Sequence, residues 1–241
     1  NEEHKFVNKD NPTGEDNVFY QSWVKMADTD TEKSLLKLLN VSDLTAGEYP
    51  ESLLNVEPIE IIADNALKTN DHVAFPNYVS QSLDLVLTTT NLRGLNFNID
   101  FKDSESVITN HGGFFRYKIA NESYAPGIPT DEDSLYFVLD LKDEKHVNYL
   151  KDATLSTSAF PIGLKSREIK IAQEYVARYP KYLFDRSEGI RVDLKEDTIY
   201  TFNSVDGGLI NNEPFGIGMK VLLEKNPTIK EKDNYAIIMV D

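Results

Sequence analysis

The feature that most constrains the fold is a change in hydrophobic periodicity after residue 76. Before it, apolar residues recur at helical spacing in Thr31–Asn40 and Glu51–Lys68, and Pro58 should end or kink part of the second helix. After it, short segments with the patterning of β-strands alternate with longer helical segments. Such alternation favours an α/β fold, in which helices cover the faces of a central sheet.

The strand patterns differ in the burial that they indicate. Leu83–Thr90 is an apolar run that indicates burial on both faces. Leu95–Phe101 alternates apolar and polar residues, which is typical of a half-exposed strand, and the two segments together predict an antiparallel, hairpin-like part. His111-Gly112-Gly113 is expected to form a hairpin turn. Further strands are expected at Phe114–Ala120, Leu135–Leu141, Thr198–Phe202 and Tyr235–Val240.

Helices are expected between these strands. Glu144–Phe160 has a second half of small residues, which allow a helix to lie close to a sheet, and Pro161 should end it. Pro214–Glu224 carries its proline at an early position, where the missing N–H costs nothing. The pattern of Ile169–Ala177 does not distinguish a strand from a helix.

The chain is expected to contribute one partial domain over residues 1–241. A loop is expected at 1–18, a helical segment at 19–80, and the sheet with its helices at 81–241. The chain does not begin with Met, and its last expected strand runs to its end, so we expect an internal part of a longer protein, incomplete at both ends.

Composition excludes several classes of function. The formal net charge of −15 repels nucleic acid, and no Lys/Arg-rich stripe offsets it. The absence of Cys excludes disulfides, thiolate catalysis and Cys-ligated zinc. The apolar runs are too short to span a bilayer, and the first residues lack the apolar region of a signal peptide. A cytoplasmic protein, or one that contacts zwitterionic or neutral lipid at the membrane periphery, is favoured.

The strongest local signal is Val205–Pro214, with the sequence Val-Asp-Gly-Gly-Leu-Ile-Asn-Asn-Glu-Pro. It follows an expected strand and precedes an expected helix. Two interpretations are open. The segment is a simple strand-to-helix turn, because Gly pairs permit positive φ and Asp and Asn suit turns and N-caps. Alternatively, Asp206 lies at the carboxyl end of a strand, where sites of α/β proteins form, and its carboxylate accepts a proton from a serine hydroxyl.

Two further segments bear on this choice. Thr88-Thr89-Thr90-Asn91 ends an apolar strand, and Ser158-Ala159-Phe160-Pro161 ends a helix of small residues. The order of these two segments and the Asp-Gly-Gly segment resembles that of the patatin-like phospholipase family, over roughly residues 20–241. The resemblance implies a mainly parallel central sheet flanked by helices.

The resemblance also implies an activity. Asp206, followed by Gly207 and Gly208, is then the aspartate of a Ser–Asp dyad that hydrolyses fatty acyl esters of lipids. The implied partner is a lipid acyl ester substrate, with peripheral membrane contact. The family implies no metal ion or organic cofactor.

The sequence departs from this family in one respect. It contains neither the glycine-rich oxyanion loop nor a G-x-S-x-G nucleophile elbow, and Ser156, Ser158 and Ser204 are not on elbows. The nucleophilic serine is therefore expected outside this chain, which alone should be inactive. Two alternatives remain open: a non-catalytic lipid- or protein-binding module on the same scaffold, and a structural fragment with no independent function. Oligomeric state, head group and acyl length are not determined by the sequence.

Overall fold

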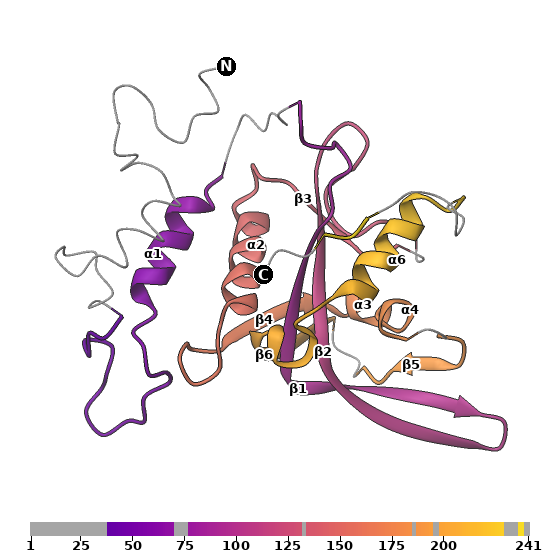
Figure 1. Ribbon diagram of the computed structural model, residues 1–241. Helices are drawn as coiled ribbons and strands as arrows, with labels where there is room; N and C mark the ends of the chain where they lie inside the picture. Colours follow the sequence, from indigo (N-terminus) through magenta and orange to yellow (C-terminus); the bar gives the residue numbers. More distant parts are fainter. Residues whose placement is uncertain are drawn as a thin grey trace.

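The computed structural model describes residues 38–69, 77–131, 134–184, 187–194, 198–228 and 236–238. Figure 1 shows a curled six-stranded sheet with helices on both faces. Its strands are β1 (Leu85–Phe101), β2 (Ser104–Ile119), β3 (Phe137–Leu139), β4 (Arg167–Ala172), β5 (Ile190–Val192) and β6 (Ile199–Asp206). The helices are α1 (Glu57–Ala66), α2 (Glu144–Thr157), α3 (Gln173–Ala177), α4 (Pro180–Leu183), α5 (Gly208–Asn211) and α6 (Phe215–Lys225).

The expectation of a mainly parallel sheet is wrong. The strand order is β3-β2-β1-β6-β4, with β5 pairing separately with β1, and the sheet is a mixed half-barrel. Of the strand pairs in the described residues, β2–β3 alone is parallel. The reason is connectivity: a tight turn joins β1 to β2 and forces an antiparallel pair. The crossover through α2 joins β3 to β4, which lie at opposite ends of the strand order and never pair.

The strand β1 is longer than the pattern indicates. The expected strands Leu83–Thr90 and Leu95–Phe101 form one strand with a register shift between Thr90 and Leu95. Gly94 takes a φ of +76° in this bulge, a conformation that glycine adopts without penalty. The hairpin therefore forms between β1 and β2. The expected burial on both faces is wrong at Leu85, which is 41% exposed.

The expected turn at His111–Gly113 is also wrong, because these residues lie within β2. Gly112 and Gly113 face Thr90 and Thr89 of β1 across the sheet. A Cβ at Gly112 would lie 3.0 Å from Ile210 Cγ2. The glycine pair thus allows close packing of α5 on the sheet rather than a change of chain direction.

The helix predictions are confirmed for α2 and α6, which match Glu144–Phe160 and Pro214–Glu224 within a few residues. The expected helix Glu51–Lys68 is shorter, because α1 begins at Glu57 and Pro58 sits in its first turn. The undetermined segment Ile169–Ala177 contains the end of β4 followed by α3. The segment Thr31–Asn40 lies mostly outside the described residues. Half of Tyr235–Val240 also lies outside them, and its described residues 236–238 form no strand.

The two faces of β2 meet different environments. Phe115 and Tyr117 point toward α2, and Phe114 points toward α4, where its ring stacks on Tyr179 at 5.5 Å between centroids. The core is formed by large side chains from both faces of the sheet, with Phe97, Phe114, Leu135, Leu139 and Val176 almost fully buried. In Figure 1, α2 and α6 accordingly lie on opposite sides of β1 and β2.

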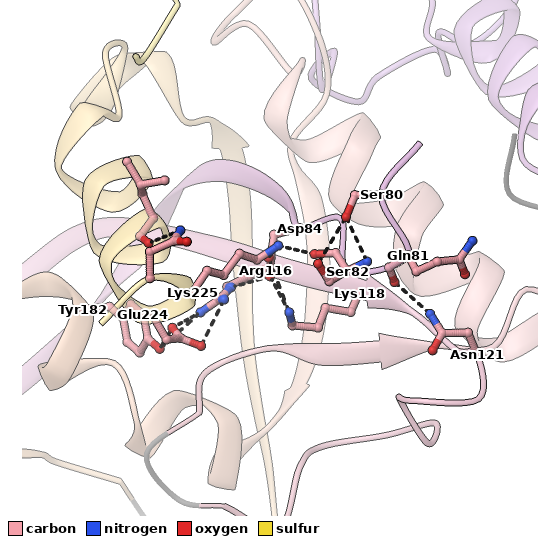
Figure 2. Close-up of polar contacts among 12 residues, drawn as sticks. Ser80, Gln81, Ser82, Asp84, Arg116, Lys118, Asn121, Tyr182, Glu224 and Lys225 are labelled. Carbon is pink, nitrogen blue, oxygen red and sulfur yellow. Dashed lines mark hydrogen bonds and ion pairs between the residues drawn. The ribbon is translucent and has the colours of Figure 1, made fainter. Parts of the chain in front are cut away.

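A buried charge network joins β2 to α6 (Figure 2). Arg116, which is fully buried, donates from Nε to Asp84 at 2.8 Å and from Nη1 to Glu224 at 2.5 Å. Its Nη2 also reaches Glu224, at 3.2 Å, so this contact is two-pronged. Lys118 and Lys225 both lie within ion-pair distance of Asp84. The network satisfies charges that would otherwise be costly to bury.

Candidate functional site

The candidate site is built where β6 ends. Asp206 is the last residue of β6, and the prediction that it follows a strand and precedes a helix is confirmed. Its main chain is fixed from two other elements: its N–H donates to Ala159 O at 3.0 Å, and its carbonyl accepts from Thr90 Oγ1 at 2.8 Å. Its carboxylate Oδ1 accepts from the N–H of Gly208 at 2.8 Å. The half-buried side chain is therefore held in one orientation.

The two glycines after Asp206 are required for close approach, not for positive φ. Gly207 has a φ of −65°, which any residue adopts. A Cβ at Gly207 would lie 2.5 Å from the backbone oxygen of Thr88, and closer still to its carbonyl carbon. At Gly208, a Cβ would lie 3.2 Å from Asp206 Oδ1 and 3.0 Å from Asn212 Oδ1. Gly207 thus brings the turn against β1, and Gly208 leaves room for the carboxylate.

A cluster of three buried hydroxyls lies beneath this turn. Ser156 donates to Ser204 Oγ at 2.6 Å, and Thr89 Oγ1 lies 3.1 Å from Ser156 Oγ and also contacts Ser204. All three side chains are almost fully buried. The cluster joins three elements, because Ser156 lies in α2, Thr89 in β1 and Ser204 in β6. Thr89 is also the residue of β1 that pairs with Asp206. Sequence reasoning missed it, because the three residues are far apart in the chain.

No serine of the described residues has a hydrogen bond to the Asp206 carboxylate. Ser156 and Ser204 bond to each other inside the protein. Ser158 is exposed, but its hydroxyl donates to the carbonyl of Thr154 at 2.9 Å. The structure therefore gives none of these three serines the place of a nucleophile beside Asp206.

Exposed apolar side chains lie close to Asp206 along the chain. Leu209 and Ile210 of α5 follow its two glycines, and they are 57% and 54% exposed. Phe160, which is 67% exposed, follows Ala159, whose carbonyl accepts from the Asp206 N–H. Exposed apolar residues are therefore found on both segments that meet at the Asp206 main chain.

Within the described ranges, no group of three or more His, Asp or Glu side chains could hold a metal ion. Across the same residues, no helix is both long and apolar enough to cross a bilayer.

Comparison with other proteins gives one relative. No protein-family model matches the chain, and no solved structure matches it. The chain is 28% identical over 250 residues to a protein of Sinorhizobium fredii described as uncharacterized protein y4iI. The similarity covers 92% of this chain and 35% of that protein, so the chain spans about a third of its relative's length.

Proposed function

We propose that this chain supplies the aspartate of a Ser–Asp dyad in a serine acyl hydrolase that cleaves fatty acyl esters of lipids. The observation that carries the proposal is the half-buried carboxylate of Asp206, fixed at the end of β6, with exposed apolar residues in the adjoining segments. The order of motifs in the sequence resembles that of patatin-like phospholipases and favours the same activity, although the sheet is mixed and differs from the mainly parallel sheet that the resemblance implies. The nucleophilic serine lies outside this chain.

In this proposal Asp206 acts as the general base. Its Oδ1 is held by the Gly208 N–H, and no described residue has a hydrogen bond to Oδ2, which leaves that oxygen to accept the proton of a serine hydroxyl. The serine oxygen then attacks the ester carbonyl, the ester C–O bond breaks, and the leaving oxygen takes the proton back from Asp206 and departs as the alcohol. Asp206 then accepts a proton from the water that attacks the acyl-enzyme, and returns it to the serine oxygen as the fatty acid is released. Backbone amides elsewhere in the longer protein stabilise the oxyanion.

The proposed substrate is a lipid acyl ester met at a membrane periphery. In this proposal the exposed side chains of Leu209, Ile210 and Phe160, which lie in the segments adjoining Asp206, contact the acyl chain. The net charge of −15 favours zwitterionic or neutral lipid over anionic lipid, because like charges repel.

The test is the Asp206→Asn substitution in the protein that contains this chain together with its flanking sequence. Hydrolysis of p-nitrophenyl octanoate should fall by about 10²–10⁴-fold, the usual contribution of a general base. Covalent labelling by a fluorophosphonate should slow in parallel, because that probe also needs an activated serine. Asp193→Asn, at an exposed position in a loop, is the matched control and should leave both rates unchanged.

Two results would contradict the proposal. If Asp206→Asn retains full hydrolysis, Asp206 is not the base. If the wild-type protein neither cleaves the ester nor reacts with the fluorophosphonate, the protein is not a serine hydrolase, and the non-catalytic binding module becomes the better hypothesis.

A further inference from the structure

A cavity of about 470 Å³ lies between α2, the β2–β3 side of the sheet and β4. This volume falls within the roughly 300–1,000 Å³ range of small-molecule sites. The cavity is separate from the carboxylate of the proposed dyad: Ile199, which lines it, is the first residue of β6, and Asp206 is the last. The two ends of such a strand are roughly 23 Å apart at about 3.3 Å per residue.

The cavity follows from the curl of the sheet. Because β3 and β4 lie at opposite ends of the strand order, the curl brings them to either side of α2. Lys145, Tyr149 and Ala153 of α2 are spaced four residues apart and so share the helix face that lines the cavity. The small side chain of Ala153 leaves open the space that a larger residue would fill.

The interior of the cavity is apolar. Its deep walls include Phe115, Ala153 and Ile169, which are 4%, 1% and 6% exposed and present only carbon atoms from their side chains. The two buried tyrosines in the walls already have partners. Tyr117 donates to the carbonyl of Tyr149 at 3.5 Å, and the hydroxyl of Tyr175 accepts from the N–H of Arg116 at 2.9 Å. A polar ligand would lose its hydrogen bonds to water here without replacing them.

The charged groups are arranged differently from the walls. Lys145 lines the cavity and is exposed, and its ammonium lies 5.7 Å from the centre of the Tyr149 ring, so it stands at the rim. The side chain of Lys170 points to the opposite face of β4 from Ile169 and pairs with Glu168 at 2.8 Å. The carboxyl of Asp152 is the acidic group in the lining, and burial raises its pKa, against the opposing effect of Lys151 and Arg167. A bound anion would therefore avoid Asp152 and lie at Lys145, with the apolar part of the ligand innermost.

We propose that this cavity binds an aliphatic carboxylate, with its hydrocarbon tail between α2 and the sheet and its carboxylate at Lys145. The tail matches the apolar walls, and the anionic head is complementary to the cation that Lys145 places at the rim. The inference goes beyond the proposed hydrolysis, because binding requires neither an ester nor a serine.

The first test is a chain-length series measured by titration calorimetry on the full protein, below the micelle concentration of each ligand. Hexanoate, octanoate, decanoate and dodecanoate should bind with one-to-one stoichiometry. The Kd should fall about fourfold for each added methylene until the cavity is full. Absence of saturable binding of dodecanoate, or a Kd independent of chain length, would overturn the proposal. Failure of this test would leave the role of Asp206 open, since that role is measured by ester cleavage.

The second test concerns the head group. Removing the rim lysine, as Lys145→Ala, should weaken dodecanoate about threefold while leaving methyl dodecanoate unchanged, because exposed ion pairs contribute modestly. Lys142→Ala, at an exposed position just before α2 and outside the lining, is the control and should change neither Kd. If dodecylamine binds more tightly than dodecanoate, Asp152 holds the head group and the assignment to Lys145 is wrong.

The third test fills the cavity. Ala153→Phe should abolish dodecanoate binding, because the new ring occupies the tail's position. Since Ala153 is buried, Ile171→Trp at the half-buried end of β4 serves as a second variant if the first fails to fold. A folded variant of either kind that retains the wild-type Kd would show that dodecanoate binds elsewhere.

Discussion

The substitution Gly207→Ala offers a sharp test of the site geometry. The backbone of Gly207 is already α-helical, so alanine brings no φ/ψ strain. The cost is steric: the new Cβ would lie 2.5 Å from the Thr88 oxygen and nearer its carbonyl carbon, and main-chain atoms of a paired strand cannot rotate away. Overpacking costs about 1–3 kcal/mol, and an overlap this close with main-chain atoms belongs at the upper end of that range. Restricting the unfolded chain returns about 0.4–1 kcal/mol. We therefore expect a net loss of about 2 kcal/mol.

The assay is thermal or urea unfolding, with Gly218→Ala as the matched control. Gly218 lies inside α6, and a Cβ there would meet nothing within 4 Å. The same chemical change should then stabilise the protein by about 0.5–1 kcal/mol. For a chain of this size, the expected Tm changes are a loss of about 4–8 °C for Gly207→Ala and a gain of about 1–4 °C for Gly218→Ala. A Gly207→Ala protein as stable as the wild type would refute the close packing of this turn on β1.

Three further predictions concern buried charges. Arg116→Met should destabilise the protein by about 3 kcal/mol in urea unfolding, since two carboxylates lose their shared partner. Although burial opposes ionisation of Asp84, hydrogen bonds from Lys225 and Arg116 keep its pKa below the ordinary 3.8. The ionised Asp84 carboxylate therefore stabilises the fold above about pH 3.8, and this stabilisation is lost as the pH falls through the lower pKa of the folded state. Thermal unfolding measured between about pH 5 and pH 2 should show this loss. Burial raises the pKa of Asp152 above 3.8, so the folded state resists its ionisation. Asp152→Asn should accordingly stabilise the protein at about pH 7, and the gain should vanish at about pH 3, where the carboxyl is protonated in both states.

The individual elements could be predicted from the sequence because their signals are local. The helix α2 follows from the spacing of apolar residues, and Asp143 caps its first turn by accepting from the N–H of Lys145. The strand β6 was expected at Thr198–Phe202, and it extends to Asp206, where the Asp-Gly-Gly turn ends it. Such patterns report which residues are extended or helical, and they depend on neighbours within a few positions.

The pairing of the strands could not be predicted in the same way. Periodicity shows that a segment is a strand, but it carries no information about the partner or its direction. The bulge at Thr90–Leu95 hides the continuity of β1, because the apolar alternation loses its phase there. Gly112 and Gly113 resemble a turn when considered alone. They are strand residues because they pair with Thr90 and Thr89 of β1, and this pairing is not visible in the local sequence.

The candidate site could likewise be predicted only in part. The position of Asp206 at the end of a strand could be predicted, because it is a local pattern, but the reason for Gly207 could not. A positive φ can be expected from a glycine pair, whereas a contact with Thr88, well over a hundred residues earlier, cannot. The hydroxyl cluster of Thr89, Ser156 and Ser204 is missed for the same reason.

The strand β2 shows how a short sequence can serve two environments at once. In Phe115-Arg116-Tyr117-Lys118, aromatic and cationic residues alternate, and neighbouring side chains of a strand point to opposite faces. The aromatic residues line the cavity beside α2, and the cationic residues enter the charge network beside α6. Cations in an aromatic run are costly to bury without partners, so such a pattern itself indicates carboxylates on the opposite face. Applied to this sequence, that argument would have predicted the network, although not that its partners are Asp84 and Glu224.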